Sequence, residues 1–280
     1  MVAVVITAHG EGRALARLMA RLQPAGPARS TRPTHLTSDL SVVVVAYGSA
    51  GNASEIAAGY GSDAQVIAVQ PDSKLLAIRA GDAAAIGFPR VFLDADTEID
   101  ERGVRALAAR AAEPGVLAVA PERVLDLAGC SLPVRWYYRV WTRLPEVRRG
   151  LFGRGALAVS EAGHQRLAGL PALLAGDLGA SLPFAPAERR VAADAKVTLR
   201  PPGSLACLLR TRAALVAAAR SWRPGRAPTA VVRVPAGDVL GVVRDDPAIA
   251  LRLPAFLAVT AAAWLLAVTG SAGAGRGQAG

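Results

Sequence analysis

The chain has 280 residues, enough for one large α/β domain with an appendage. Its formal net charge is +10, carried almost entirely by arginine. Because the arginines are spread along the chain and no recognition module is present, we do not expect nucleic acid as a partner. Abundant Ala, Gly and Arg is also typical of a GC-rich genome. The two cysteines, Cys130 and Cys207, lack metal or redox spacing, which favours a reducing compartment.

The first half of the chain alternates between two hydrophobic periods. Short β-branched runs predict buried strands, and stretches with apolar residues three or four apart predict helices between them. This alternation predicts an α/β fold with an open, mostly parallel sheet and helices on both faces. Strands are expected at 2–7, 40–46, 64–69, 91–93, 116–120, 156–159 and 191–199, and helices near 15–22, 53–58, 74–86, 101–112 and 136–141.

Two carboxylates follow the buried run at 90–93, namely Asp94 and Asp96. At the end of an extended strand, residues i and i+2 point the same way, so Asp94 and Asp96 could hold one hard cation. The carboxyl end of a strand in an open α/β sheet is also where ligands tend to bind. From this motif alone, two interpretations stay open. One is a metal-bridged diphosphate site, and the other is an acidic turn that caps the next helix.

The last third of the chain is basic and then apolar. Residues 204–235 predict a basic amphipathic helix and a linker without acids, and residues 236–280 predict a hydrophobic membrane-associated segment with a disordered tail. The uncharged stretch at 253–275 could be a weak single span or a helix embedded in the interface. If it inserts, Arg244 and Arg252 before it would keep the main domain cytoplasmic. The main domain is expected at 1–203, with a flexible loop at 24–39.

Five stretches in this order resemble the inverting, nucleotide-sugar-dependent glycosyltransferases with the GT-A fold, often called family 2. The resemblance is to the membrane-associated, actinobacterial type and extends over about residues 2–212. A polar end to the first strand, a Gly-Ser turn, a lysine-led helix, an Asp-Ala-Asp element and a Gly-Arg-Gly segment carry it. These stretches are 4–11, 42–52, 74–81, 91–96 and 153–156, the last followed by 175–179.

The resemblance implies a glycosyltransferase with a GT-A-like sheet that uses Mg²⁺ or Mn²⁺. It implies a nucleotide-sugar donor and a lipid-linked or glycan acceptor, at the cytoplasmic face of the cell membrane. The residue roles that it implies are Asp94 and Asp96 for the metal and diphosphate, Asp177 as general base, Glu11 and Lys74 near the nucleotide, and Arg210 and Arg212 near the diphosphate or the bilayer.

The chain also departs from this family. Ala46 and Tyr47 stand where an aspartate usually contacts the nucleotide, and Gly176 precedes the expected base where an acid is usual. No Gln-x-x-Arg-Trp segment is present, which argues against a processive synthase. Two alternatives therefore stay open: a degenerate GT-A domain that binds a nucleotide or a partner without catalysis, and a nucleotidyltransferase with a poor loop at 9–13. We interpret His35 and His164 as surface residues.

Overall fold

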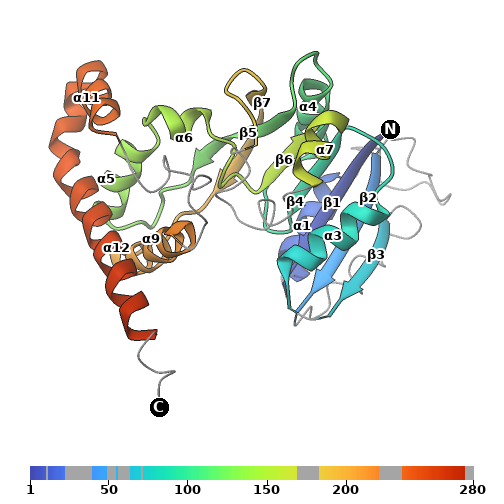
Figure 1. The fold of residues 1–280 in the computed structure, drawn as a ribbon, viewed down its shortest axis with the longest axis horizontal. Helices are drawn as coiled ribbons and strands as arrows, with labels where there is room; N and C mark the ends of the chain where they lie inside the picture. Colours follow the sequence, from blue (N-terminus) through green and yellow to red (C-terminus); the bar gives the residue numbers. More distant parts are fainter. Residues whose placement is uncertain are drawn as a thin grey trace. The chain divides into compact units, whose positions relative to one another are not determined.

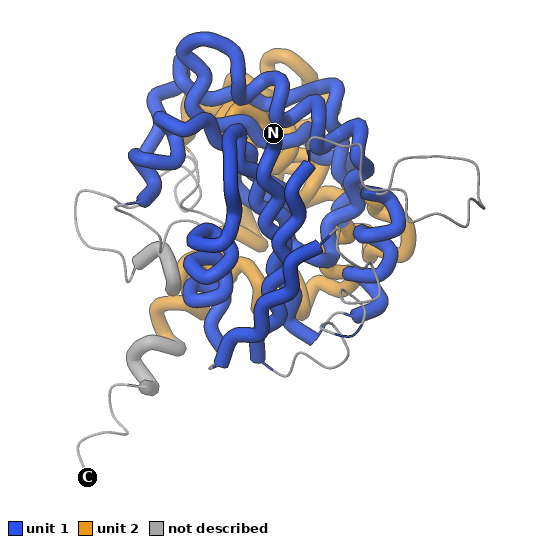
Figure 2. Tube along the Cα trace, turned by 90° about the vertical axis from the view of Figure 1, so that its right-hand side faces the viewer, with its two compact units in different colours: residues 1–124, 151–199 blue, residues 125–150, 200–280 orange. Residues whose placement is uncertain are grey.

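The computed structural model describes residues 1–10, 12–22, 40–48, 55, 64–70, 72–168, 183–220 and 235–274. The chain divides into two compact units (Figure 2). Unit 1 comprises residues 1–124 and 151–199, and unit 2 comprises residues 125–150 and 200–280. The flexible loop expected at 24–39 lies outside the described residues, as does all but Glu55 of the helix expected at 53–58.

A seven-stranded sheet forms the centre of unit 1, in the order β3-β2-β1-β4-β6-β5-β7 (Figure 1). Strand β1 pairs in parallel with β2 and β4, and β2 pairs in parallel with β3, whereas β6 runs antiparallel to β4 and β5. The predicted, mostly parallel α/β sheet is thus confirmed. The strands are β1 (Val2–Ala8), β2 (Leu40–Tyr47), β3 (Ala64–Val69), β4 (Arg90–Asp94), β5 (Ala118–Leu125), β6 (Ala156–Val159) and β7 (Arg189–Leu199).

Helices cover both faces of this sheet, because successive side chains of a strand point to opposite sides. On one face, Val4 and Ile6 of β1 belong to a buried cluster with α1 (Gly12–Leu22) and α4 (Glu101–Ala111). On the other face, Ala3 and Val5 belong to a cluster with α3 (Lys74–Ala84) and α7 (Glu161–Ala168). The expectation of helices on both faces is therefore also confirmed.

The regular structure of unit 2 is almost entirely helical over the residues that the structure describes. Helix α12 (Leu253–Ala274) packs along α9 (Leu205–Arg220) and α5 (Leu132–Trp141). Its Phe256 ring stacks on Tyr137 of α5, with the ring centres 5.2 Å apart. The helix expected at 136–141 is thus present and begins four residues earlier. The other helices of unit 2 are α6 (Pro145–Arg149), α11 (Ala236–Asp245) and the 3-10 helix η2 (Pro247–Arg252).

Candidate active site

The carboxyl ends of β1 and β4 meet at one edge of the sheet. Thr7 pairs with Asp94 in the parallel register, and the Thr7 carbonyl accepts a hydrogen bond from the Ala95 N–H at 3.0 Å. The Thr7 hydroxyl also donates to Asp94 Oδ1 at 3.3 Å. The register therefore fixes one carboxylate at the edge of the sheet where ligands of open α/β sheets bind.

A lysine from the neighbouring helix reaches this carboxylate. Ser73 caps α3 by accepting a hydrogen bond from the Leu76 N–H at 3.3 Å, so Lys74 is the first helical residue. Lys74 Nζ lies 2.7 Å from Asp94 Oδ1, and about 30% of each side chain is exposed. The pair is therefore partly shielded from water and still open to a ligand.

Asp96 lies in a turn, not on an extension of the strand. Strand β4 ends at Asp94, and the Thr97 N–H returns to the Asp94 carbonyl at 3.0 Å. Ala95 is buried within this turn and Asp96 is exposed. The expectation that the strand extends through Asp96 is wrong, because β4 ends two residues earlier, so strand alternation does not set the direction of the Asp96 side chain. Their shared role as metal ligands stays a prediction.

A turn between two glycines forms the facing wall of the site. The Gly155 carbonyl accepts hydrogen bonds from the Asp94 N–H at 2.9 Å and from the Thr97 hydroxyl at 2.8 Å. Gly153 and Gly155 both have positive φ, at 59° and 65°. Such a backbone is favourable for glycine and strained for other residues. The turn that ends β4 and the turn that leads into β6 are thereby joined.

Arg154, between these glycines, lines the same pocket as Thr7, Lys74 and Asp94. The pocket contains about 520 Å³ of space, including its open mouth. Only 3% of Arg154 is exposed, and one of its N–H groups donates to the Pro121 carbonyl at 2.6 Å. Burial lowers the pKa of the Arg154 guanidinium to about 10, partly opposed by the charge of Glu122, so the group stays cationic at neutral pH.

A second polar cluster lies beyond the ends of β1 and β2. His9 Nε2 lies 3.0 Å from Asp72 Oδ2, and the His9 ring lies 5.0 Å from that of Tyr47. The turn at Gly48 is tight, since a Cβ there would lie 2.6 Å from His9 Nε2. Asp72 thus brings a carboxylate to the turn at Gly48, directly after the end of β2.

The donor chemistry of the first cluster fits a hard divalent cation. Within the described ranges, no group of three or more His, Cys, Asp or Glu side chains could hold a metal. Asp94 and Asp96 would therefore supply two carboxylates at most. Mg²⁺ is commonly bound in this way, through one or two carboxylates, with water and substrate phosphates completing the shell.

The structure does not test the other residues predicted for the site. Glu11 and Asp177 lie outside the described residues, so their roles stay predictions. Arg210 and Arg212 belong to unit 2, where Arg210 is exposed. The Arg212 guanidinium lies 5.6 Å from the ring centre of Tyr137 and 5.8 Å from that of Trp141. Arg212 thus contacts aromatic rings within unit 2.

Sequence reasoning missed Arg154 and Asp72 as site residues. Arg154 lies in the Gly-Arg-Gly stretch at 153–156, and an arginine between two glycines could have indicated a cation held at a turn. The sequence shows that Asp72 lies just before the helix that begins at Lys74. It does not show the contact of Asp72 with His9, because the two residues are 63 positions apart.

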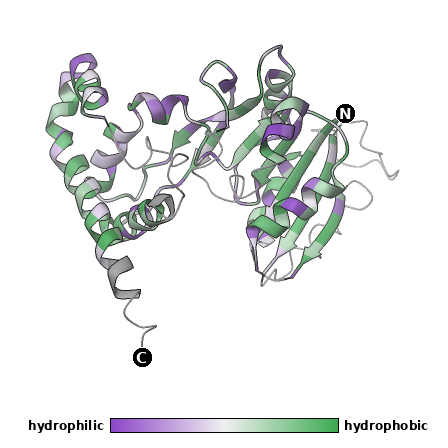
Figure 3. Cartoon of the chain, viewed as in Figure 1, coloured by the Kyte–Doolittle hydropathy of each residue, from purple (hydrophilic) through white to green (hydrophobic). Residues whose placement is uncertain are grey.

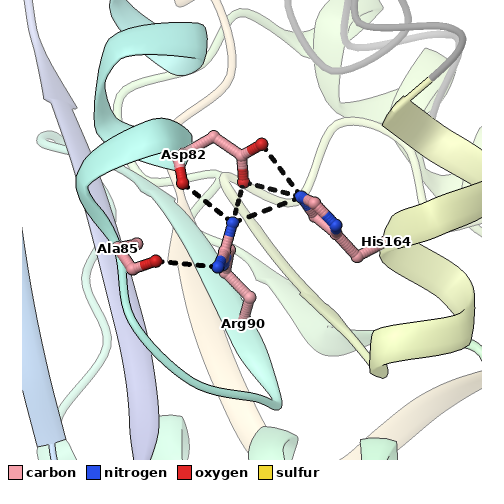
Figure 4. Close-up of polar contacts among 4 residues, drawn as sticks. All are labelled: Asp82, Ala85, Arg90 and His164. Atoms are coloured by element: carbon pink, nitrogen blue, oxygen red, sulfur yellow. Dashed lines mark hydrogen bonds and ion pairs between the residues drawn. The ribbon is translucent and has the colours of Figure 1, made fainter.

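A different polar cluster ties the opposite end of β4 to its neighbours (Figure 4). Arg90 forms an ion pair with Asp82 and donates to the Ala85 carbonyl at 2.8 Å. His164 Nε2 of α7 lies 2.8 Å and 2.9 Å from the two Asp82 oxygens. The interpretation of His164 as a surface residue is wrong, because only 17% of its side chain is exposed. The cluster joins α3, β4 and α7 and has a structural role.

Among the comparisons with known proteins, only the comparison with solved structures finds a match. No family model matches the chain, and no curated protein matches it. A glucosyl-3-phosphoglycerate synthase from Mycobacterium tuberculosis, with Mn²⁺, UDP-glucose and phosphoglyceric acid, is 17% identical with a TM-score of 0.49, and 72% of each chain is covered. TarS from S. aureus, in complex with UDP-GlcNAc, is 11% identical with a TM-score of 0.48, over 88% of this chain and 73% of that one. At these values the likenesses assign no residue role or substrate.

Proposed function

We propose that the chain is a metal-dependent glycosyltransferase of the GT-A type. It would transfer a sugar from a nucleoside-diphosphate donor to a hydroxyl of a lipid-linked or glycan acceptor, with inversion at the anomeric carbon. The observation that carries this proposal is the Lys74–Asp94 ion pair at the carboxyl edge of the parallel sheet, in one pocket with Arg154. Two cations and a carboxylate at this edge suit an anionic ligand that carries a divalent ion.

Different residues of the pocket bind different parts of the donor. Lys74 and Arg154 bind the diphosphate, and Arg154 brings a charge that the Pro121 carbonyl holds in place. Asp94 positions the Lys74 ammonium group and, with Asp96, would hold Mg²⁺ or Mn²⁺. A bound cation of this kind stabilises negative charge that develops on the departing diphosphate. Glu11 and the cluster of His9, Tyr47 and Asp72 would lie toward the nucleoside.

Asp177 would act as the general base of the reaction. Its carboxylate takes the proton of the acceptor hydroxyl while that oxygen forms its bond to the anomeric carbon. The bond from the anomeric carbon to the phosphate oxygen breaks on the opposite face of the sugar, and both electrons leave with the nucleoside diphosphate. Attack from the opposite face gives the inverted configuration.

We further propose that the enzyme works at the cytoplasmic face of the cell membrane. Two features of the sequence support this location. The apolar helix α12 follows Arg244 and Arg252, and the anionic lipids of the cytoplasmic leaflet attract basic residues beside an apolar segment. Among the described residues, one helix, Pro247–Thr269, is long and apolar enough to cross a membrane by length and composition.

A donor screen with the purified full chain tests the transferase. The chain is incubated with Mn²⁺ and a panel of UDP-, GDP- and dTDP-sugars, and release of the nucleoside diphosphate is followed by chromatography. We expect release from one donor class, with loss of release on chelation and in Asp96→Asn. Turnover that survives both treatments would overturn the metal role.

A second candidate function is nucleotide binding without catalysis. The observation that favours it is the end of β2, where Ala46 and Tyr47 replace the usual acid and His9 lies against Tyr47. Titration calorimetry separates the two functions. Nucleoside-diphosphate binding with no turnover of any donor supports the binding module, whereas turnover excludes it.

A further inference from the structure

The net charge of the chain lies entirely in one of its two units. By sequence, unit 1 contains 17 basic and 17 acidic residues and is neutral. Unit 2 contains 15 arginines and five acids and therefore carries the whole formal charge of +10. A compositional bias of the genome would act on both units, so it does not explain this difference. The charge gives unit 2 an attraction for anionic surfaces over about a Debye length.

The same unit exposes an apolar helix face. In α12, buried residues recur three or four positions apart at Phe256, Val259, Ala263 and Ala267, and this side packs against α5 and α9. The rest of the α12 surface is also largely apolar, and Figure 3 shows green along the helix. Large side chains are exposed there, by 50% at Leu257 and 56% at Leu265 and by 49% and 47% at Trp264 and Leu266. A contiguous exposed apolar surface of this kind marks an interaction site.

The packing of α12 argues against a spanning role for this helix. Tyr137 of α5 stacks on Phe256 of α12, and the Arg212 guanidinium of α9 lies over the Tyr137 ring. The charge of Arg212 therefore lies against a ring that itself packs on α12. Helix α5 also carries the exposed Arg135 and Arg139. If α12 crossed a bilayer with its partners attached, these arginines would enter the hydrocarbon, where a charged side chain is unfavourable.

We infer that unit 2 docks peripherally on an anionic lipid bilayer, with the exposed face of α12 lying in the interface. The apolar side chains enter the boundary between headgroups and acyl chains, and the arginine excess is attracted by the anionic headgroups. Trp264 is suited to this depth because its ring is amphipathic. The inference rests on the membrane location proposed above and specifies the lipid class and the mode of attachment.

Flotation of the full chain with lipid vesicles tests the docking. We expect at least about 10-fold stronger binding to phosphatidylcholine vesicles containing phosphatidylglycerol than to phosphatidylcholine alone, since each basic residue near the surface adds about 1 kcal/mol. Raising the salt concentration should weaken the binding, and alkaline carbonate should release the chain. Equal binding to both vesicle types, or resistance to carbonate, would overturn the inference, and resistance would indicate a spanning helix.

Substitutions on the exposed face separate docking from folding and from turnover. Leu265→Glu should reduce vesicle binding at least about 10-fold and leave the thermal midpoint unchanged, because the side chain is exposed. Ile86→Glu, which changes a 69% exposed apolar residue of unit 1, is the matched control and should bind vesicles like the unmodified chain. Loss of binding in both variants, or in neither, contradicts the assignment. Vesicle binding is measured without donor, so failure of the transferase proposal would leave this result intact.

Discussion

Lys74 Nζ lies 2.7 Å from Asp94 Oδ1, and this contact joins the first residue of α3 to the last residue of β4. Both residues lie at the edge of the sheet where parallel strands end. The Thr7 hydroxyl reaches the same carboxylate oxygen from β1. Three elements thus converge on one atom, and the ligand-binding properties of the pocket should depend on the charge of Lys74.

Replacement of this lysine tests its contact with the donor diphosphate. Lys74→Ala should raise the KM for the nucleotide sugar by about 10- to 100-fold, because a charge-assisted hydrogen bond contributes about 1.5–3 kcal/mol. Steady-state kinetics with the preferred donor measure the effect. Arg79→Ala, which removes an exposed cation from the same helix and does not line the pocket, should leave the KM unchanged. An equal KM in both variants would exclude Lys74 from donor binding.

Asp96 is exposed in its turn, so its carboxylate is accessible to a metal ion, and the nearly isosteric Asp96→Asn tests this role. Asp96→Asn should lower Mn²⁺-dependent kcat by about 100-fold or more, as expected for loss of a ligand whose cation stabilises the leaving group. Calorimetric titration of Mn²⁺ into the complex with nucleoside diphosphate should show weaker binding, with an unchanged thermal midpoint. Glu161→Gln removes another exposed acid of unit 1 and is the control. Normal Mn²⁺ affinity in Asp96→Asn would contradict the assignment.

The fold was predictable from sequence because its strands are short β-branched runs between polar turns. Alternation along 2–7 and 40–46 places residues on both faces of the sheet, and the structure has helices on both. Serine is a favoured N-cap residue, and Ser160 and Ser204 accept hydrogen bonds from the N–H groups of Gly163 and Cys207. These features depend on neighbours within a few residues.

The site was predictable only in part, because its residues meet through turns and long-range packing. Asp94 ends a strand and could be recognised, whereas the direction of Asp96 depends on where that strand stops. Arg154 is held by Pro121, which lies 33 residues away. The partner of His164 is Asp82, which is 82 residues away. Nothing local in the sequence indicates such pairs.

Substitution of Gly155 tests whether its turn supports the pocket. Gly155→Ala should destabilise the chain in two ways. A residue with a Cβ at positive φ costs about 1–2 kcal/mol, and here the Cβ would also collide with the Thr97 hydroxyl and break its hydrogen bond. The denaturant midpoint of unfolding should fall. Donor binding should also weaken, because the Gly155 carbonyl accepts a hydrogen bond from the Asp94 N–H and so helps to position Asp94.

A second glycine separates backbone strain from the collision. Gly115 also has positive φ, at 78°, but a Cβ there would meet nothing within 4 Å. Gly115→Ala should therefore lower the midpoint by the strain alone and leave donor binding normal. If the two alanine variants are equally stable, the contact between Thr97 and Gly155 does not support the pocket.

The ion pair of Arg90 with Asp82 should stabilise unit 1 without affecting catalysis. Only 8% of the Arg90 side chain is exposed, so Asp82→Asn would leave a nearly buried cation without its counter-charge. Breaking such a pair costs about 3 kcal/mol or more, and His164 loses its contact with a charged carboxylate as well. Denaturant unfolding measures the loss, and the KM for the donor should be unchanged, since Arg90 and Asp94 lie at opposite ends of β4. Glu113→Gln is the control, because its pair with Arg110 is nearly half exposed on both sides and should contribute little to stability. Similar small losses in both variants would show that the Asp82 cluster is no more than a surface contact.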